Sequence, residues 1–139
     1  ATVTPVLVLV QVVLGAGYRH GAITVLPHVV GAVVIGFIIL TVALFAVTQF
    51  GSHRVLRGSG IHLLGVASVQ ILFGIAAYIV RVTYENPGTT PGWAIAVPIL
   101  HVATGAMTLA AATVLSVQIL RNVQARDRVS SEAVPVSEQ

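Results

Sequence analysis

Long apolar runs alternate with short polar breaks along the whole chain. A helix that crosses a bilayer needs about 20 apolar residues, and four runs reach or approach this length, at about 3–18, 27–50, 61–80 and 94–120. The breaks between them hold turn-forming and charged residues, at 18–21, 51–60 and 81–93. The pattern predicts an all-α integral membrane protein, with residues 1–120 folded as an up-down-up-down bundle of four transmembrane helices.

Composition supports a membrane protein and excludes several kinds of site. Of the 139 residues, 56% are hydrophobic and 8% are charged, whereas a soluble domain carries about 25% charged residues. The chain has no cysteine, which excludes disulfides, iron–sulfur clusters and covalent c-type haem attachment. The formal net charge is +3, but the charges lie at the ends of apolar runs. There they set membrane topology, so no nucleic-acid partner is expected.

The arginines predict the orientation of the chain. The second loop and the tail hold five of them, Arg54, Arg57, Arg121, Arg126 and Arg128, whereas the first and third loops hold only Arg19 and Arg81. Basic residues favour the cytoplasmic side. We therefore expect a multi-pass protein of the cell (inner) membrane with both termini in the cytoplasm. Residues 121–139 would form a polar cytoplasmic tail that is partly disordered.

Two parts of the chain repeat the same pattern. The segment QVVLG at 11–15 recurs as QILFG at 70–74, and after each the next apolar run opens near a proline and a histidine, His28 and His101. The repeat predicts a duplicated two-helix unit. Because each unit has an even number of spans, both copies cross the membrane in the same direction. Related residues then lie at equal depth around an axis along the membrane normal.

The repeat suggests a haem site. The second and fourth helices of such a bundle lie diagonally, so His28 and His101 would face each other near the exterior end. Facing imidazoles are suitable axial ligands for a six-coordinate haem iron, and we expect one b-type haem. Gly31 and Gly105, about one turn beyond the histidines, would leave room for the macrocycle, although helix packing explains these glycines equally well. The histidines could instead simply bond to neighbouring backbone.

Polar residues on the first and third helices extend the candidate site. Gln11 and Arg19 share one face of the first helix, because they are separated by two steps of four residues. Gln70 and Arg81 occupy the third helix in a similar order. Arginine binds carboxylates with a bidentate fork, so Arg19 is a candidate for a haem propionate, with Arg81 or Tyr18 assisting. Alternatively, the arginines are ordinary residues of the membrane interface, and the glutamines form hydrogen bonds between helices.

Three further histidines do not form a second repeated pair. His20 lies in the short exterior turn, and His53 and His62 lie near the cytoplasmic end. Since no repeat relates them, we do not expect a second haem there.

The segment 11–16, the turn containing Tyr18 and Arg19, and His28 at the start of the next run resemble haem A synthase. That family consists of two similar four-helix halves with histidines on the second and fourth helices. This chain has the length of one half, and the resemblance covers about 11–120. It implies that His28 and His101 are the paired haem ligands. The catalytic half carries a glutamate where this chain has Val25, and it has an exterior cysteine pair that is absent here. The chain thus resembles the non-catalytic half, which holds a b-type haem.

These observations predict a cytochrome-like protein that transfers single electrons. Bis-histidine ligation leaves no open position on the iron, so substrate chemistry at the metal is disfavoured. The expected partners are membrane lipid and other membrane redox subunits, and a homo-oligomer remains open. One alternative is a half-size haem A synthase-like enzyme that acts as an oligomer. Another is a structural membrane subunit without a cofactor.

Overall fold

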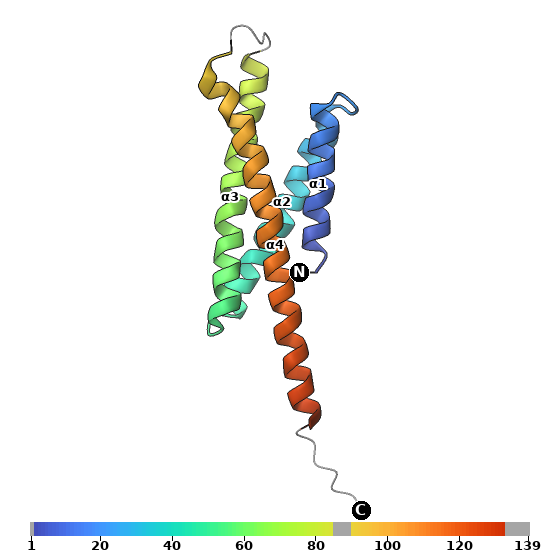
Figure 1. The fold of residues 1–139 in the computed structure, drawn as a ribbon, viewed down its shortest axis with the longest axis vertical. Helices are drawn as coiled ribbons and strands as arrows, with labels where there is room; N and C mark the ends of the chain where they lie inside the picture. Colours follow the sequence, from blue (N-terminus) through green and yellow to red (C-terminus); the bar gives the residue numbers. More distant parts are fainter. Residues whose placement is uncertain (1, 85–89, 133–139) are drawn as a thin grey trace, which may run out of the picture.

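A computed structural model describes residues 2–84 and 90–132, with side chains up to residue 122. The described chain is all-helical (Figure 1). Its helices are α1 (Thr4–Arg19), α2 (Val25–Gln49), α3 (Arg54–Thr83) and α4 (Gly92–Glu132).

Local sequence explains several helix ends. Pro5 occupies the first turn of α1, where its missing N–H costs no hydrogen bond. The turn after α1 contains Gly21 with a φ of 71°, a conformation that glycine adopts readily. The side chain of His53 caps α3 by accepting a hydrogen bond from the backbone N–H of Leu56, at 3.4 Å. These short connections return the chain at once into the next helix.

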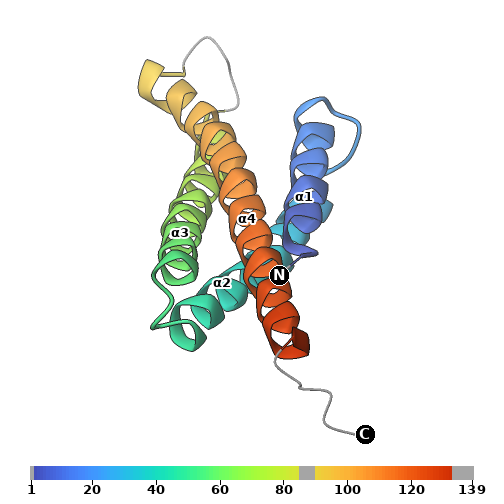
Figure 2. The same cartoon turned by 60° about the horizontal axis from the view of Figure 1, so that its bottom comes forward.

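The four helices form a closed ring of contacts. α1 packs against α2 and α4, and α3 packs against the same two helices. α2 and α4 therefore lie diagonally. Figure 1 shows the α1–α2 turn at the same end as the adjoining ends of α3 and α4, and the α2–α3 turn at the opposite end. In Figure 2, α1 and α3 lie on opposite sides of α4.

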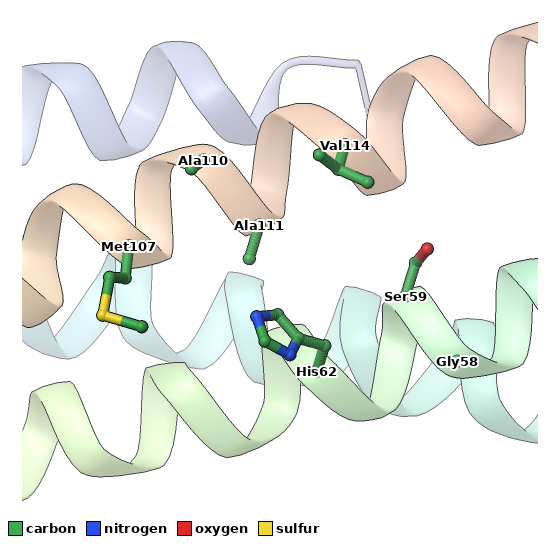
Figure 3. A pocket seen from close by; sticks show the side chains of 7 residues that line it. All are labelled: Gly58, Ser59, His62, Met107, Ala110, Ala111 and Val114. Atoms are coloured by element: carbon green, nitrogen blue, oxygen red, sulfur yellow. The ribbon is translucent and has the colours of Figure 1, made fainter.

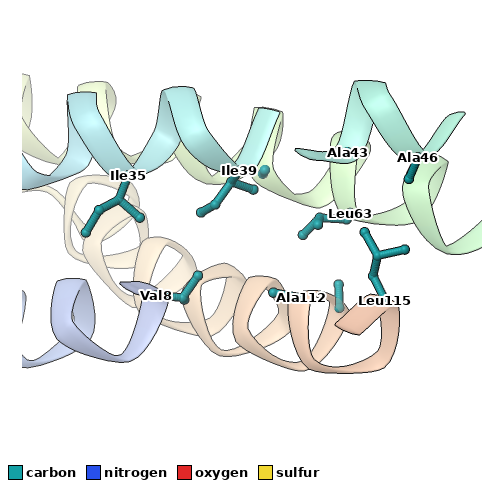
Figure 4. Packing of buried hydrophobic residues seen from close by; sticks show 10 residues of the cluster. Val8, Ile35, Ile39, Ala43, Ala46, Leu63, Ala112 and Leu115 are labelled. Atoms are coloured by element: carbon teal, nitrogen blue, oxygen red, sulfur yellow. The ribbon is translucent and has the colours of Figure 1, made fainter. Parts of the chain in front are cut away.

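The packed core occupies the half of the bundle that contains the α2–α3 turn (Figure 4). Leu63 and Leu115 are its largest fully buried side chains. Small residues allow close helix approach here: a Cβ at Gly60 of α3 would lie 3.0 Å from the Cβ of Ala46 on α2. In the other half, α2 has no buried residue before Ile35. Few side chains there are shielded by packing within the chain.

Three helices are long and apolar enough to cross a membrane: Val25–Gln49, Arg54–Thr83 and Gly92–Asn122. They indicate a membrane protein. Thr4–Arg19 is apolar but shorter than these helices. Length and composition therefore support three of the four expected spans, and the first expected span lacks this support.

Two expected boundaries differ from the structure. The expected loop at 51–60 is mostly helical, because α3 already begins at Arg54. Its glycine at position 60 serves close packing with α2 rather than a turn. The expected polar tail also begins as helix, since α4 continues to Glu132. Arginine, glutamine and alanine in this segment are good helix formers. The rest of the expected tail, 133–139, lies outside the described residues.

Candidate functional site

The structure brings His28 and His101 together. Their ring centroids are 6.4 Å apart and the ring planes are inclined by 79°. His28 lies in the first turn of α2, and His101 lies well inside α4, which begins at Gly92. This corrects the expectation that both histidines open a helix. Both side chains are half-buried, and they come from the two diagonal helices.

In the first copy of the repeat, α1 holds His28 through a glutamine and a glycine. The Nε2 atom of Gln11 donates to the backbone oxygen of His28 at 2.7 Å and lies 3.0 Å from its Nδ1 atom. A Cβ at Gly15 would lie 2.9 Å from Cε1 of the ring. Since ordinary carbon contacts are about 3.5–4.0 Å, the imidazole can occupy this place only beside glycine.

The second copy uses the same residue types. A Cβ at Gly74 would lie 3.0 Å from Cε1 of His101. The side chain of Gln70 lies against Gly105, with Nε2 3.1 Å from the position of a Cβ. The hydroxyl of Thr104 donates to Oε1 of Gln70. Each histidine therefore packs on a glycine of the neighbouring helix, and that glycine lies one turn after a glutamine.

The two expected glycines contact glutamines of the neighbouring helices. Gly31 and Gly105 were expected either to leave room for a macrocycle or to serve helix packing, and in the structure they adjoin the side chains of Gln11 and Gln70. The glycines that touch the imidazoles are Gly15 and Gly74, whose contact sequence reasoning missed. Their position at the end of the repeated QxxxG pattern was the signal that could have found them. Thr104 was also missed, and nothing in the repeat pointed to it.

The two expected arginines lie at the end of the bundle where α1 and α3 finish. Both side chains are exposed. Nε of Arg81 donates to the hydroxyl of Tyr18 at 3.4 Å, which links the end of α3 to the end of α1. This leaves Arg19 and Arg81 near the same end as His28, but neither contacts an imidazole in any described hydrogen bond.

The remaining histidines lie elsewhere. His53 caps α3 and its Nε2 lies 3.1 Å from Oδ1 of Asn122, so it has a structural contact with α4. His62 projects from α3 into an open groove of about 490 Å³ between α3 and α4 (Figure 3). Met107 and Ala111 line the α4 side of this groove. Neither histidine belongs to the pair.

Two buried polar atoms at the pair have no hydrogen-bond partner within the described part of the chain. They are Oε1 of Gln11 and Nδ1 of His101. Buried polar atoms without partners are rare in native proteins and require an explanation. Each atom belongs to one copy of the repeat, so the two copies are not chemically identical.

Searches against protein-family models, curated proteins and solved structures found no significant match to this chain. The function must therefore be argued from the site itself.

Proposed function

We propose that this protein binds one b-type haem between His28 and His101 and transfers single electrons within a membrane. The observation that carries the proposal is the separation of the two rings, 6.4 Å between centroids. A metal–imidazole nitrogen bond is about 2 Å long, so two rings that share one metal have centroids about 6 Å apart. The described pair has this separation.

The donor set favours haem over a bare metal ion. Among the described residues, no group of three or more histidine, cysteine, aspartate or glutamate side chains gathers at one place. Zinc sites take three or four protein ligands, whereas a porphyrin supplies four nitrogens and leaves two axial positions for the protein. A pair of facing histidines is sufficient only for the second case.

The neighbouring residues fit such a group. A metal-bound imidazole carries its proton on the nitrogen that faces away from the metal, and an acceptor normally receives this proton. For His28, Oε1 of Gln11 is buried and has no partner. In the structure the amide turns its Nε2 atom toward this site: Nε2 lies 3.0 Å from Nδ1 and donates to the backbone oxygen of His28 at 2.7 Å. Gln11 therefore fixes the position of the His28 ring, and its amide would have to turn over and give up the bond to the backbone oxygen before Oε1 could accept from an Nδ1–H group.

The distribution of packing also agrees with the proposal. The buried core lies in the half of the bundle away from the histidines. α1 has no buried residue after Val8, and α3 has none after Ala67. A flat ligand between the hairpins would therefore displace few packed side chains.

We place the site in an up-down-up-down bundle of four spans that is built from a duplicated two-helix unit. In this bundle α1 crosses the membrane together with the three longer helices. Positive-inside topology then puts both termini in the cytoplasm of a cell (inner) membrane protein. Arg19, Arg81 and Tyr18 lie at the exterior end, where they can bind haem propionates. This arrangement resembles the non-catalytic half of haem A synthase, and other membrane redox subunits would supply and remove electrons.

When bound, haem supplies reversible one-electron chemistry. The chain's own residues bind it, fix its orientation and set its potential. Because His28 and His101 would both hold the group, the site would favour electron transfer over substrate oxidation. The α1–α3 helices and α4 up to Asn122 also contain no aspartate or glutamate, so they offer no carboxylate for the alternative enzyme function.

The test is a reduced-minus-oxidised absorption spectrum of the purified protein, with haem extracted and identified. We expect a b-type α-band. It should be largely lost in His28→Gly and His101→Gly and restored by added imidazole, which fills the space of the missing ring. His62→Gly is the matched control and should keep the band. A protein without haem would favour the structural-subunit alternative, and extracted haem A would favour the enzyme. Loss of the band in His62→Gly alone would refute the ligand assignment.

A further inference from the structure

A groove runs between α3 and α4 from the end of the bundle at the α2–α3 turn toward the middle. Ser59 and Val114 border its first part, which has a volume of about 490 Å³. A second part of about 390 Å³ extends to Val69. His62 and Met107 line both parts and are exposed, so the groove is continuous and open. Both helices are long and apolar enough to cross a membrane, and the groove would therefore face lipid.

Three exposed arginines lie at the mouth of the groove: Arg54, Arg57 and Arg121. Arg54 precedes Gly58 by one turn of α3, and Arg57 adjoins this glycine. Arg121 follows Val114 by two turns of α4. Residues at these spacings share one face of a helix, so on both helices the face that lines the groove leads to an arginine.

A contact between the two helices brings these charges to one level. Nε2 of His53 lies 3.1 Å from Oδ1 of Asn122, and each of these residues is next to an arginine in the sequence. No aspartate or glutamate occurs at 2–84 or 90–122. The nearest carboxylate further along α4 is that of Asp127, which stands between two more arginines. The mouth of the groove is therefore a basic site.

Polarity falls along the groove from the mouth inward. The arginines come first, Ser59 and His62 follow, and Val69 and Met107 line the deeper part. Figure 3 shows Ser59 and His62 projecting from α3 toward α4. At a rise of about 1.5 Å per residue, His62 lies about 12 Å and Val69 about 22 Å from Arg54 along α3. The interfacial layer on each side of a bilayer is about 5–8 Å thick. With the arginines at headgroup depth, His62 lies just inside the hydrocarbon and Val69 deep within it.

We propose that this groove binds an anionic phospholipid, with the phosphate on Arg54 and Arg121 and the ester groups beside His62. One acyl chain then lies along the apolar part of the groove. Arginine binds phosphate with a bidentate fork, and an anionic amphiphile matches the order of charged, polar and apolar residues. The inference does not rest on the proposed haem function, and the lipid titration below can fail or succeed independently of the haem spectrum.

The charge at the mouth disfavours two other occupants of a membrane groove. A quinone has an uncharged head, so it would leave the arginines without a counter-charge. A second copy of the chain in the same orientation would bring its own arginines to the same depth, where like charges oppose association. Only an anionic partner complements this end of the groove.

The test is native mass spectrometry of the purified chain in a nonionic detergent, titrated with lipid, because bound lipid and oligomeric state are read together. We expect dioleoylphosphatidylglycerol to bind more tightly than dioleoylphosphatidylcholine, which has the same chains and no net charge. A basic residue near an anionic surface contributes about fivefold in affinity, so Arg54→Gln combined with Arg121→Gln should weaken phosphatidylglycerol binding about thirtyfold. Arg54→Lys combined with Arg121→Lys keeps both charges and is the matched control, which should retain the preference for phosphatidylglycerol.

A second variant tests the position of the acyl chain. Gly65 lines the groove, and nothing lies within 4 Å of a Cβ at this position, so Gly65→Leu fills the groove without a clash. Displacing about two methylene groups of the lipid should lower its affinity about tenfold. Gly92→Leu is the matched control, because a Cβ there also meets nothing within 4 Å and the site is at the far end of α4.

The outcomes decide between the occupants. Equal affinity of the wild type for the two lipids contradicts the inference, and so does a double glutamine variant that still prefers phosphatidylglycerol. Unchanged lipid binding in Gly65→Leu places the chain elsewhere and also overturns it. If decylubiquinone binds with an affinity that Gly65→Leu lowers and the arginine substitutions leave unchanged, the groove holds a quinone instead. Dimers that Gly65→Leu abolishes while lipid binding persists would assign the groove to a second copy.

Discussion

A single methyl group at Gly15 or Gly74 should displace a histidine ring. A Cβ would lie 2.9 Å from Cε1 of His28 in the first case and 3.0 Å from Cε1 of His101 in the second. Non-bonded carbon atoms pack at about 3.5–4.0 Å, so each ring must retreat by roughly 0.5–1 Å. A ligand site tolerates only about 0.5 Å of misplacement. Gly15→Ala and Gly74→Ala should therefore weaken haem binding even where the helices still fold.

The effect on folding is smaller and its size follows from two opposing terms. Overpacking costs about 1–3 kcal/mol, whereas alanine in place of glycine stabilises a helix by about 0.8–1.0 kcal/mol. The net change in the free energy of unfolding should lie between nearly zero and a loss of about 2 kcal/mol. Haem affinity is the more sensitive measure, with an expected loss of about tenfold or more, as for other changes that misplace a metal ligand.

The assay is a haem titration of each purified variant in the same detergent, followed by thermal unfolding. Gly65→Ala on α3 is the matched control, because nothing lies within 4 Å of a Cβ at that position. It should bind haem as the wild type does and unfold at an equal or higher temperature. If Gly15→Ala and Gly74→Ala bind haem as tightly as Gly65→Ala, the rings do not rest on these glycines and the reasoning is wrong.

Two further predictions concern the bundle without a ligand. Gln11→Leu should lower the free energy of unfolding by about 0.5–1.5 kcal/mol, because Gln11 joins α1 to the backbone and ring of His28. The measurement is an unfolding titration. Gln49 lies at the exposed end of α2, so Gln49→Leu should have little effect on the unfolding free energy. Leu63→Ala should lower the free energy of unfolding by about 2–5 kcal/mol, since Leu63 is 0% exposed. Leu72 is 66% exposed, so Leu72→Ala should destabilise the protein far less in thermal unfolding. Equal losses of stability in the two variants would contradict the position of the core.

The proximity of His28 and His101 could be anticipated because the duplication constrains depth as well as order. Residues that are related by two parallel copies must lie at similar depth around the axis, and this argument needs no knowledge of side-chain packing. The approximate positions of α2, α3 and α4 were likewise accessible, because length and hydropathy determine which segments can cross a bilayer.

The rotation of the helices could not be derived in the same way. A helix that is apolar on all sides carries no periodic signal for the face that packs inward. Two interpretations of Gly31 and Gly105 stayed open for this reason, since their partners depend on the rotation that brings Gln11 and Gln70 toward them. The contact of Thr104 with Gln70 is equally invisible, because a hydroxyl in a membrane helix often bonds only to its own backbone.

The division of the bundle into a packed half and a half that contains the histidines would link folding to the proposed haem binding. His28 belongs to the α1–α2 hairpin and His101 to the α3–α4 hairpin. At the opposite end the hairpins are joined by the core around Leu63 and Leu115. At the end near the histidines the described links are the ring contact of His28 with His101 and the bond from Arg81 to Tyr18. A haem bound by both histidines would tie the hairpins together where packing is sparse. Its binding free energy would therefore stabilise the bundle directly, as for any ligand that binds only the folded state.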